Sequence, residues 1–252
     1  MFDYATISEF IATTAATTTA ATLLILFVAY LVRGIAGFGS GLIAIPLLSI
    51  SHPLTTVVPL VIILDILGSL VQSTSSRSKI RWDELVILLP FTIVGCVLAL
   101  FLFKNIDLAK LNYSLAIFII FFAIYQILPM PELRGTRIWS VPAGFLGGLI
   151  GTLFGTGGPL YMIYLSLRGL HKDEIRASYA TYFFVDGSIR IAGFTAVGFL
   201  GWQLLGYLFI WIPAAAIGLF VGGRVHTGIS NQTFKYIISL ILVYSGYRLL
   251  NN

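Results

Sequence analysis

Charged side chains are scarce in this 252-residue sequence. Asp, Glu, Lys and Arg together make up 10% of it, whereas hydrophobic residues make up 58%. Soluble domains carry about 25% charged residues, and they need polar side chains to cover their surface. The composition therefore excludes an ordinary water-soluble domain, and it predicts that lipid surrounds most of the chain.

Cysteine and histidine are also rare. The single cysteine, Cys96, lies inside an apolar run, which excludes internal disulfides and cysteine-based metal sites and is typical of a small core residue. The three histidines, His52, His171 and His226, lie at the ends of apolar segments without a metal-binding spacing. We expect neither a metal ion nor another cofactor.

Positive charge is limited to short segments between apolar runs. The net charge of +5 would fit nucleic-acid binding, but the sequence has no basic stripe with interleaved aromatic residues. The first positive charge, Arg33, follows the first apolar run, whereas a secretory signal begins with basic residues. We expect no nucleic-acid partner, no signal peptide, and an N-terminus outside the cytoplasm.

Ten apolar segments run along the chain. A helix that crosses a bilayer needs about 20 residues, and six of the segments reach or approach this length. The first, second, sixth and seventh are short and interrupted by glycine. The segments are 18–33, 36–51, 54–72, 84–103, 109–128, 138–151, 153–167, 177–199, 202–222 and 232–250. The sequence predicts an all-α fold, a polytopic transmembrane helical bundle.

Basic residues are distributed unevenly between the two sides of this bundle. If every segment crosses, the inner loops hold Arg77, Lys79, Arg81, Arg134, Arg137, Arg168, Lys172, Arg176, Arg224 and Lys235, and the outer side holds Lys104, Lys110 and Arg248. This bias follows the positive-inside rule and predicts a multi-pass protein of the cytoplasmic membrane. The same sidedness results if each short pair forms a re-entrant hairpin, so both arrangements stay open.

The chain contains an internal repeat. Residues 38–41, Phe-Gly-Ser-Gly, correspond to residues 154–157, Phe-Gly-Thr-Gly, and further matches follow in the same order. These are Asp65 with Asp186, Trp82 with Trp202, Pro90 with Pro213, Gly95 with Gly218, Ile106 with Ile229, and Tyr113 with Tyr236. We predict a first membrane repeat in residues 1–130 and a second in 131–252. Each holds five segments, an odd number, so the second repeat is expected to be inverted.

Inverted repeats with helices interrupted at corresponding positions are typical of secondary transporters, which bind substrate at the repeat interface. A duplicated structural membrane protein is the alternative. The interruptions contain Gly39, Ser40 and Gly41 in the first repeat, and Gly155, Thr156, Gly157 and Gly158 in the second. Unwound backbone followed by a helix start directs free N–H groups and a positive dipole end to one point, which suits an anion. Close helix packing is the other use of such glycines.

Three ionisable residues are predicted inside the bilayer, where charge is costly and usually functional. Asp186 and Arg190 are one helical turn apart and are expected to pair. Asp65 is equivalent to Asp186, but Arg190 aligns with Ser69, so the sequence predicts a positive charge in one half only. We predict substrate binding by Arg190 and ion coupling by Asp65 and Asp186. A purely structural Asp186–Arg190 pair is the alternative.

Arg33 is the second basic candidate. If all ten segments cross, it is a charge at the cytoplasmic boundary, and we favour this interpretation. If the short segments form hairpins, Arg33 lies near the site instead.

The paired glycine motifs, each followed by a proline, resemble the TauE/SafE sulfite exporter family of membrane permeases. The resemblance extends from about residue 23 to residue 250. It implies transport of small sulfur-containing or carboxylate anions, and it places the family motifs on residues 39–41 with Pro46 and on residues 155–158 with Pro159. Ser40 stands where the family commonly has a further glycine, so no single compound is named.

We therefore predict a secondary transporter for a small organic or sulfur-containing anion, ion-coupled and working by alternating access. An anion channel is the alternative, because it would use the same backbone donors. The sequence has no nucleotide-binding loop and no recognisable Ser/His/Asp arrangement, so we expect no enzyme; an intramembrane enzyme would need such a constellation at one depth. The expected partners are a small anion and the lipid bilayer, with a homodimer as a candidate assembly.

Overall fold

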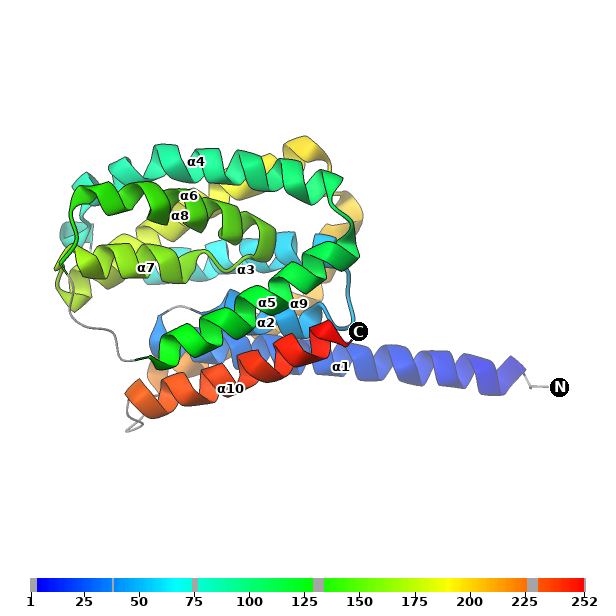
Figure 1. Cartoon of the computed structure of the whole chain (residues 1–252). Helices are drawn as coiled ribbons and strands as arrows, with labels where there is room; N and C mark the ends of the chain where they lie inside the picture. The colour runs from blue at the N-terminus through cyan, green and yellow to red at the C-terminus, as the bar shows by residue number, and fades with distance from the viewer. Residues whose placement is uncertain (1–3, 38, 74–76, 129–133, 226–230, 252) are drawn as a thin grey trace.

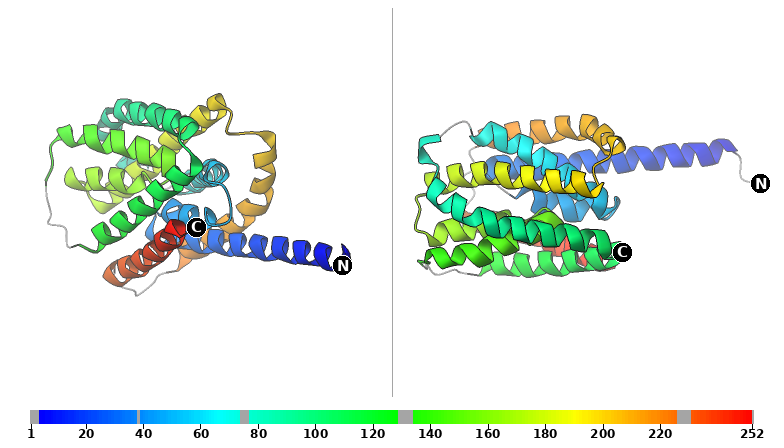
Figure 2. Two further views of the ribbon diagram at one scale, coloured as in Figure 1. Left: turned by 45° about the vertical axis from the view of Figure 1, so that its right-hand side comes forward. Right: turned by 90° about the horizontal axis from the view of Figure 1, so that it is seen from above.

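A computed structural model describes residues 4–37, 39–73, 77–128, 134–225 and 231–251 of the chain. Phe38, His226 and Ile229, which entered the sequence predictions, lie outside the described residues. Figure 1 shows the helices as one elongated bundle, and Figure 2 shows that the first turns of helix α1 extend beyond it.

Every regular element in the described ranges is a helix. The elements are α1 (Tyr4–Ala36), α2 (Ser40–Leu48), α3 (Leu54–Ser73), η1 (Arg77–Lys79), α4 (Trp82–Asn105), α5 (Leu108–Ile127), η2 (Arg137–Trp139), α6 (Ser140–Phe154), α7 (Gly158–Leu167), α8 (Lys172–Val197), α9 (Trp202–Arg224) and α10 (Asn231–Leu250). Each of the ten predicted segments corresponds to one α-helix, which confirms the all-α prediction.

The largest difference is at α1, which begins at Tyr4 and not near residue 18. The stretch before residue 18 is rich in alanine and threonine, so its hydropathy is too low to mark a membrane segment. Alanine nevertheless has the highest helix propensity of all residues. Hydropathy alone therefore missed the beginning of this helix.

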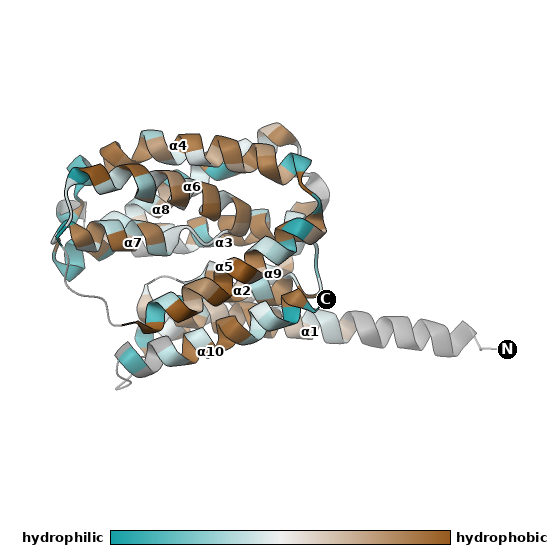
Figure 3. Cartoon of the chain, in the orientation of Figure 1, coloured by the Kyte–Doolittle hydropathy of each residue, from teal (hydrophilic) through white to brown (hydrophobic). Residues whose placement is uncertain are grey.

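Helix length and surface composition indicate a bilayer environment. Five helical stretches are long and apolar enough to cross a membrane: Ala16–Ala36, Trp82–Asn105, Leu108–Ile127, Arg137–Phe154 and Gly206–Arg224. Large apolar side chains also face outward, and Phe209 and Leu240 expose 83% and 73% of their surface. Hydrophobic colour covers the middle of the helices, and hydrophilic colour gathers at their ends (Figure 3). The protein is a multi-pass membrane protein.

Helices of the two halves pack against each other in a symmetric pattern. The helices α3 and α5 pack with their counterparts α8 and α10, whereas α1 packs with α9, the counterpart of α4, and α6 packs with α4. Gly218 and Gly222 of α9 leave no room for a β-carbon beside the backbone of Phe27 and Leu31 of α1. Because these residue numbers rise together, α1 and α9 run parallel. Two halves related by a two-fold axis would give this pattern of contacts. The division near residue 130 and the inversion of the second half stay predictions.

The helices α6 and α7 form a hairpin. The amide of Gly135, which precedes α6, donates to the carbonyl oxygen of Leu167, the last residue of α7, at 2.8 Å. If α7 continued α6 in one direction, these residues would be about 48 Å apart at 1.5 Å per residue. Figure 1 shows the two helices side by side. Both arrangements left open by the sequence include this reversal, so the choice between two full crossings and a re-entrant hairpin stays a prediction.

The helices α1 and α2 also reverse direction. His52, shortly after α2, has its ring 6.1 Å from that of Trp211. Trp211 precedes by two turns the part of α9 that contacts Phe27, and α9 runs parallel to α1. The end of α2 therefore returns toward the beginning of α1. Between the two helices, Gly37 and Gly39 have φ values of 85° and 98°, which glycine adopts without strain.

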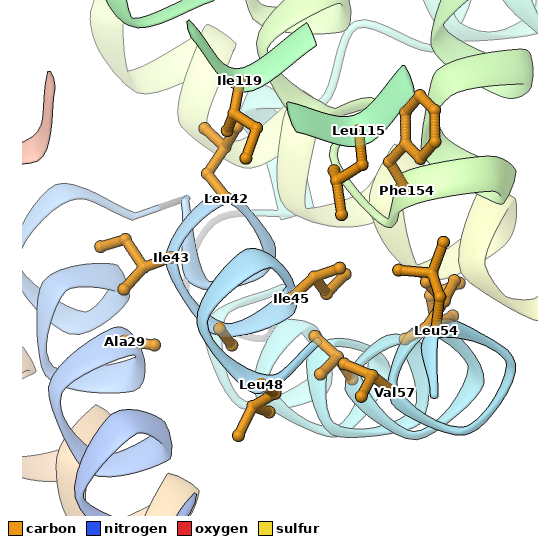
Figure 4. Close-up of a cluster of buried hydrophobic side chains, with 14 of the residues drawn as sticks. Ala29, Leu42, Ile43, Ile45, Leu48, Leu54, Val57, Leu115, Ile119 and Phe154 are labelled. Atoms are coloured by element: carbon orange, nitrogen blue, oxygen red, sulfur yellow. The ribbon is translucent and has the colours of Figure 1, made fainter. Parts of the chain in front are cut away.

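Buried apolar side chains hold α2 inside the bundle. Leu42 of α2 points toward Ile119 of α5, and Leu115 lies beside Phe154 at the end of α6 (Figure 4). All four are less than 9% exposed. This packing fixes the first hairpin against the second.

Basic segments gather at one end of the bundle, where ion pairs connect them. Lys79 pairs with Asp173 at 2.6 Å, which places the segment after α3 beside the start of α8. Buried Glu84 accepts hydrogen bonds from Arg168 at 3.1 Å and from Arg137 at 3.4 Å. These contacts tie the open end of the α6–α7 hairpin to α4. The facing of this end toward the cytoplasm stays a prediction.

Candidate functional site

The turns of the two hairpins meet inside the bundle. We call Gly37 and residues 39–41 the first tip and residues 155–158 the second tip. A β-carbon added to Gly41 would overlap the carbonyl oxygen of Gly155, and one added to Gly155 would overlap Ile45. Glycine at these positions therefore permits backbone-to-backbone contact between two segments that are more than a hundred residues apart in the sequence.

A pocket of about 10 Å³ lies where the tips meet, which is about the space that one water molecule needs. Seven of the residues predicted for the site line it: Gly39, Ser40, Gly41, Asp65, Gly155, Thr156 and Gly158. Arg33, Tyr179 and Phe183 also line it. Within the described chain, Gly157, Asp186 and Arg190 are not lining residues.

Two short helices begin at this pocket. Gly39 precedes the first residue of α2, and Gly157 precedes the first residue of α7, where Pro159 occupies the first turn. Proline is tolerated there because the first amide groups of a helix have no intrahelical acceptor. The positive ends of two helix dipoles therefore point to the region between the tips.

Arg33 lies inside the protein, so its interpretation as a boundary charge is wrong. Its side chain is 3% exposed, and its Nη1 lies 2.5 Å from Oδ1 of Asp65. Its Nη2 donates to the backbone oxygen of Asp65 at 3.0 Å and to the hydroxyl of Ser69 at 2.7 Å. The physical reason is the hairpin: because the chain turns back after α1, the end of this helix lies in the bundle interior.

The prediction of a positive charge in one half only is also wrong. Arg33 contacts Ser69, the residue that aligns with Arg190. Each half therefore has a buried arginine–aspartate pair, but the guanidinium comes from α1 in one half and from α8 in the other. Alignment of the two halves could not reveal this exchange, because the two arginines occupy unrelated sequence positions.

Three donors converge on one carboxylate oxygen of Asp65. Its Oδ1 accepts from Arg33 at 2.5 Å, from the hydroxyl of Ser40 at 2.6 Å, and from the hydroxyl of Tyr30 at 2.7 Å. Hydrogen bonds of this charged type are short and about twice as strong as neutral ones. Sequence reasoning missed Tyr30, although its position three residues before Arg33 places both on one helix face.

The second pair, Asp186 and Arg190, is completely buried. Arg190 Nε donates to Oδ1 of Asp186 at 3.1 Å, and its Nη2 pairs with Oδ2. The same Nη2 lies 3.3 Å from the carbonyl oxygen of Gly147 and 3.4 Å from the hydroxyl of Tyr161. Gly147 belongs to α6 and Tyr161 to α7, so Arg190 lies between the two arms of the second hairpin.

The ring of Phe183 lies near both arginines. The guanidinium carbons of Arg33 and Arg190 lie 5.5 Å and 6.0 Å from the ring centre of Phe183, and only Arg33 lines the pocket. A β-carbon on Gly151 would overlap the guanidinium of Arg190, so the hairpin encloses that group tightly. The geometry fits the structural alternative for Asp186 and Arg190; the predicted roles in binding and coupling stay predictions.

Two buried donors at the pocket have no hydrogen-bond acceptor among the described residues. They are Nε of Arg33 and the hydroxyl of Thr156, and both residues line the pocket. Leaving a buried donor unpaired costs about 1–3 kcal/mol. The pocket therefore offers more donors than the described protein atoms satisfy.

Comparison with known proteins assigns the chain to a protein family. The sequence model of the sulfite exporter TauE/SafE matches residues 22–249, a stretch that includes both hairpins. The chain belongs to the TauE/SafE sulfite exporter family. It is also 26% identical over 202 residues to the probable inner membrane transporter protein TsaS of Comamonas testosteroni, covering 75% of this chain and 81% of the relative. No solved structure matches the chain.

Family membership confirms the resemblance noted from the glycine motifs. This TauE/SafE family member is a membrane transporter. The matched stretch contains the two tips, Arg33 and Asp65, so the pocket lies within the part of the chain that defines the family.

Proposed function

We propose that this transporter moves a small organic or sulfur-containing anion of the sulfite, sulfonate or carboxylate class across the cytoplasmic membrane. The anion binds between the two hairpin tips. The observation that carries this proposal is the buried guanidinium of Arg33, which lines the pocket at the start of two helices. A guanidinium beside two helix N-termini makes a strongly positive interior region.

The donors of the pocket suit an oxyanion. A guanidinium presents several N–H groups in a planar fork that matches carboxylate and related groups. The hydroxyl of Thr156, which is buried and unpaired, adds a donor from the second tip. Sulfite, sulfonates and carboxylates each present two or three oxygens to such a set.

The small size of the pocket supports alternating access. Its volume of about 10 Å³ holds about one water, which is less than any of these anions needs. The tips must separate to admit substrate, and a hairpin that moves against the other half would open the pocket to one side at a time. Coupling to an ion through Asp65 or Asp186 belongs to this proposal.

We also propose that the protein lies in the cytoplasmic membrane with its N-terminus outside. The relative is described as an inner membrane transporter, which supports the cytoplasmic membrane as the location. The concentration of ion-paired basic segments at one end supports a cytoplasmic facing for that end and an external N-terminus. A homodimer and the absence of enzymatic activity are proposed with it.

A counterflow assay tests transport. Proteoliposomes loaded with unlabelled sulfite and diluted into labelled sulfite are expected to accumulate label transiently. The reason is that internal sulfite speeds the return of the carrier's binding site to the outside, where it binds labelled sulfite. Protein-free liposomes supply the background. Uptake that is the same with and without internal sulfite would support a channel and contradict alternating access; uptake no greater than background, with methanesulfonate and acetate also tested, would contradict the proposed substrate class.

A further inference from the structure

We propose that the carboxylate of Asp65 is an internal anion that substrate displaces from Arg33, and that Asp65 takes up one proton when this happens. The inference rests on the proposed anion site. It assigns the coupling role to Asp65 and a structural role to Asp186. The balance is simple: one proton binds to the Asp65 carboxylate as one anion binds to the Arg33 guanidinium.

Arg33 is held in place independently of the Asp65 carboxylate. Its Nη2 donates to the backbone oxygen of Asp65 at 3.0 Å and to the Ser69 hydroxyl at 2.7 Å. Neither acceptor changes when the carboxylate is protonated or turns away. The guanidinium therefore stays at the pocket, with Nη1, which now binds the Asp65 carboxylate, available to a new anion.

Of the other two donors to Asp65, Tyr30 has a second acceptor and Ser40 has a rotatable hydroxyl. The hydroxyl of Tyr30 lies 3.3 Å from the backbone oxygen of Val61, so it keeps an acceptor when the carboxylate leaves. Ser40 begins α2 beside the pocket, and its hydroxyl rotates freely about the side-chain bond. Both side chains therefore lose no obligatory partner when Asp65 becomes neutral.

Electrostatics makes the exchange of charges necessary. In a buried region of low dielectric constant, a second anion beside ionised Asp65 would be repelled by several kcal/mol, since one guanidinium would then serve two negative charges. When a proton and an anion arrive together, the net charge of the site does not change. Burying a neutral combination avoids the large cost of an uncompensated charge.

The second pair does not offer this exchange. Asp186 contacts Arg190 through both carboxylate oxygens, and both side chains are completely buried. The guanidinium of Arg190 is enclosed by the arms of the second hairpin, where Gly151 and Gly157 leave it no further room. An anion in the pocket contacts Arg33, which lines it together with Phe183, whereas Arg190 is not a lining residue.

The pH dependence of such a site can be attributed to few groups. The titratable and charged described residues that contact Asp65, the pocket or the first tip come from α1 and α8: Tyr30, Arg33, Arg176 and Tyr179. The Asp186–Arg190 pair is the next charged group, beside the ring of Phe183. Arginine and tyrosine keep one protonation state between about pH 5.5 and about pH 8.5. A change of anion affinity in this range therefore comes from Asp65 or Asp186, and substitution separates the two.

The test measures binding of methanesulfonate, which stays singly charged over the whole range. Isothermal titration of the purified protein in buffers of different ionisation enthalpy counts the protons taken up per anion, with one expected for the wild type. Because one proton binds with each anion, the dissociation constant of the wild type is expected to rise by up to about tenfold per pH unit as the pH is raised. Asp65→Asn is expected to bind with no pH dependence and no proton uptake, whereas Asp186→Asn keeps the slope of the wild type.

The outcomes separate the two proposals. Wild-type binding of methanesulfonate without proton uptake overturns the role of Asp65 and leaves the anion site standing. A flat profile for Asp186→Asn with a normal slope for Asp65→Asn overturns the assignment in the same way. Absence of binding of methanesulfonate, sulfite and acetate at every pH overturns the proposed function itself. If Asp65→Asn does not fold, the proton count on the wild type decides alone.

Discussion

Replacement of Arg33 by methionine is expected to abolish anion transport and to lower the free energy of unfolding by about 3–5 kcal/mol. The arginine and Asp65 form an ion pair in which both side chains are almost fully buried. Without the guanidinium, an ionised carboxylate stays in the interior with hydroxyl donors only. Counterflow in proteoliposomes measures the first effect, and denaturant or thermal unfolding in detergent measures the second.

A double variant separates stability from function. Arg33→Met combined with Asp65→Asn removes both charges, so most of the lost stability is expected to return while transport stays absent. Arg134→Gln is the matched control, because Arg134 is an exposed residue at the end of the bundle; its transport and stability are expected to equal those of the wild type. Transport at the wild-type rate in folded Arg33→Met would remove Arg33 from the site.

Substitution of Gly41 by alanine is the second change with a large expected effect. The added β-carbon would overlap the carbonyl oxygen of Gly155 on the opposite tip. A backbone atom cannot move aside as a side chain can, so the tips must separate at a cost of about 1–3 kcal/mol. We expect loss of transport, because the closed arrangement of the tips is no longer reached, together with a lower unfolding temperature.

Gly223 supplies the control for this change. It also lies in a helix, but a β-carbon there would have no atom within 4 Å. Alanine is favoured over glycine in a helix interior by up to about 1 kcal/mol, so Gly223→Ala is expected to be neutral or slightly stabilising with transport unchanged. Equal transport by Gly41→Ala and Gly223→Ala would mean that close contact of the tips is unnecessary.

The helices were largely predictable from the sequence, because apolar runs report directly on membrane environment. Both glycine interruptions were recognised, and so was their likeness. The position of each turn inside the bundle was not predictable, since hydropathy does not show how deep a turn lies. That single unknown decided the place of Arg33: the same residue is a surface charge in a continuous crossing and a buried group in a hairpin.

The arginine–aspartate pairs illustrate the same limit. The spacing of Asp186 and Arg190 within one helix correctly predicted that they pair. Their place behind the second tip depends on how α6 and α7 enclose α8, which is a tertiary property. The contact between Arg33 and Asp65 joins two different helices, and no local pattern in the sequence indicates it.

The central claim is that the anion binds between the hairpin tips, against Arg33. Selenite resembles sulfite in shape and charge, and its selenium atom scatters X-rays anomalously. In crystals of the protein with selenite, the anomalous peak of selenium is expected between the hairpin tips. The selenite oxygens around it are expected at hydrogen-bond distance, about 3 Å, from the donor groups of Arg33 and Thr156. A peak beside Arg190, or peaks on the surface with none between the tips, would contradict the account.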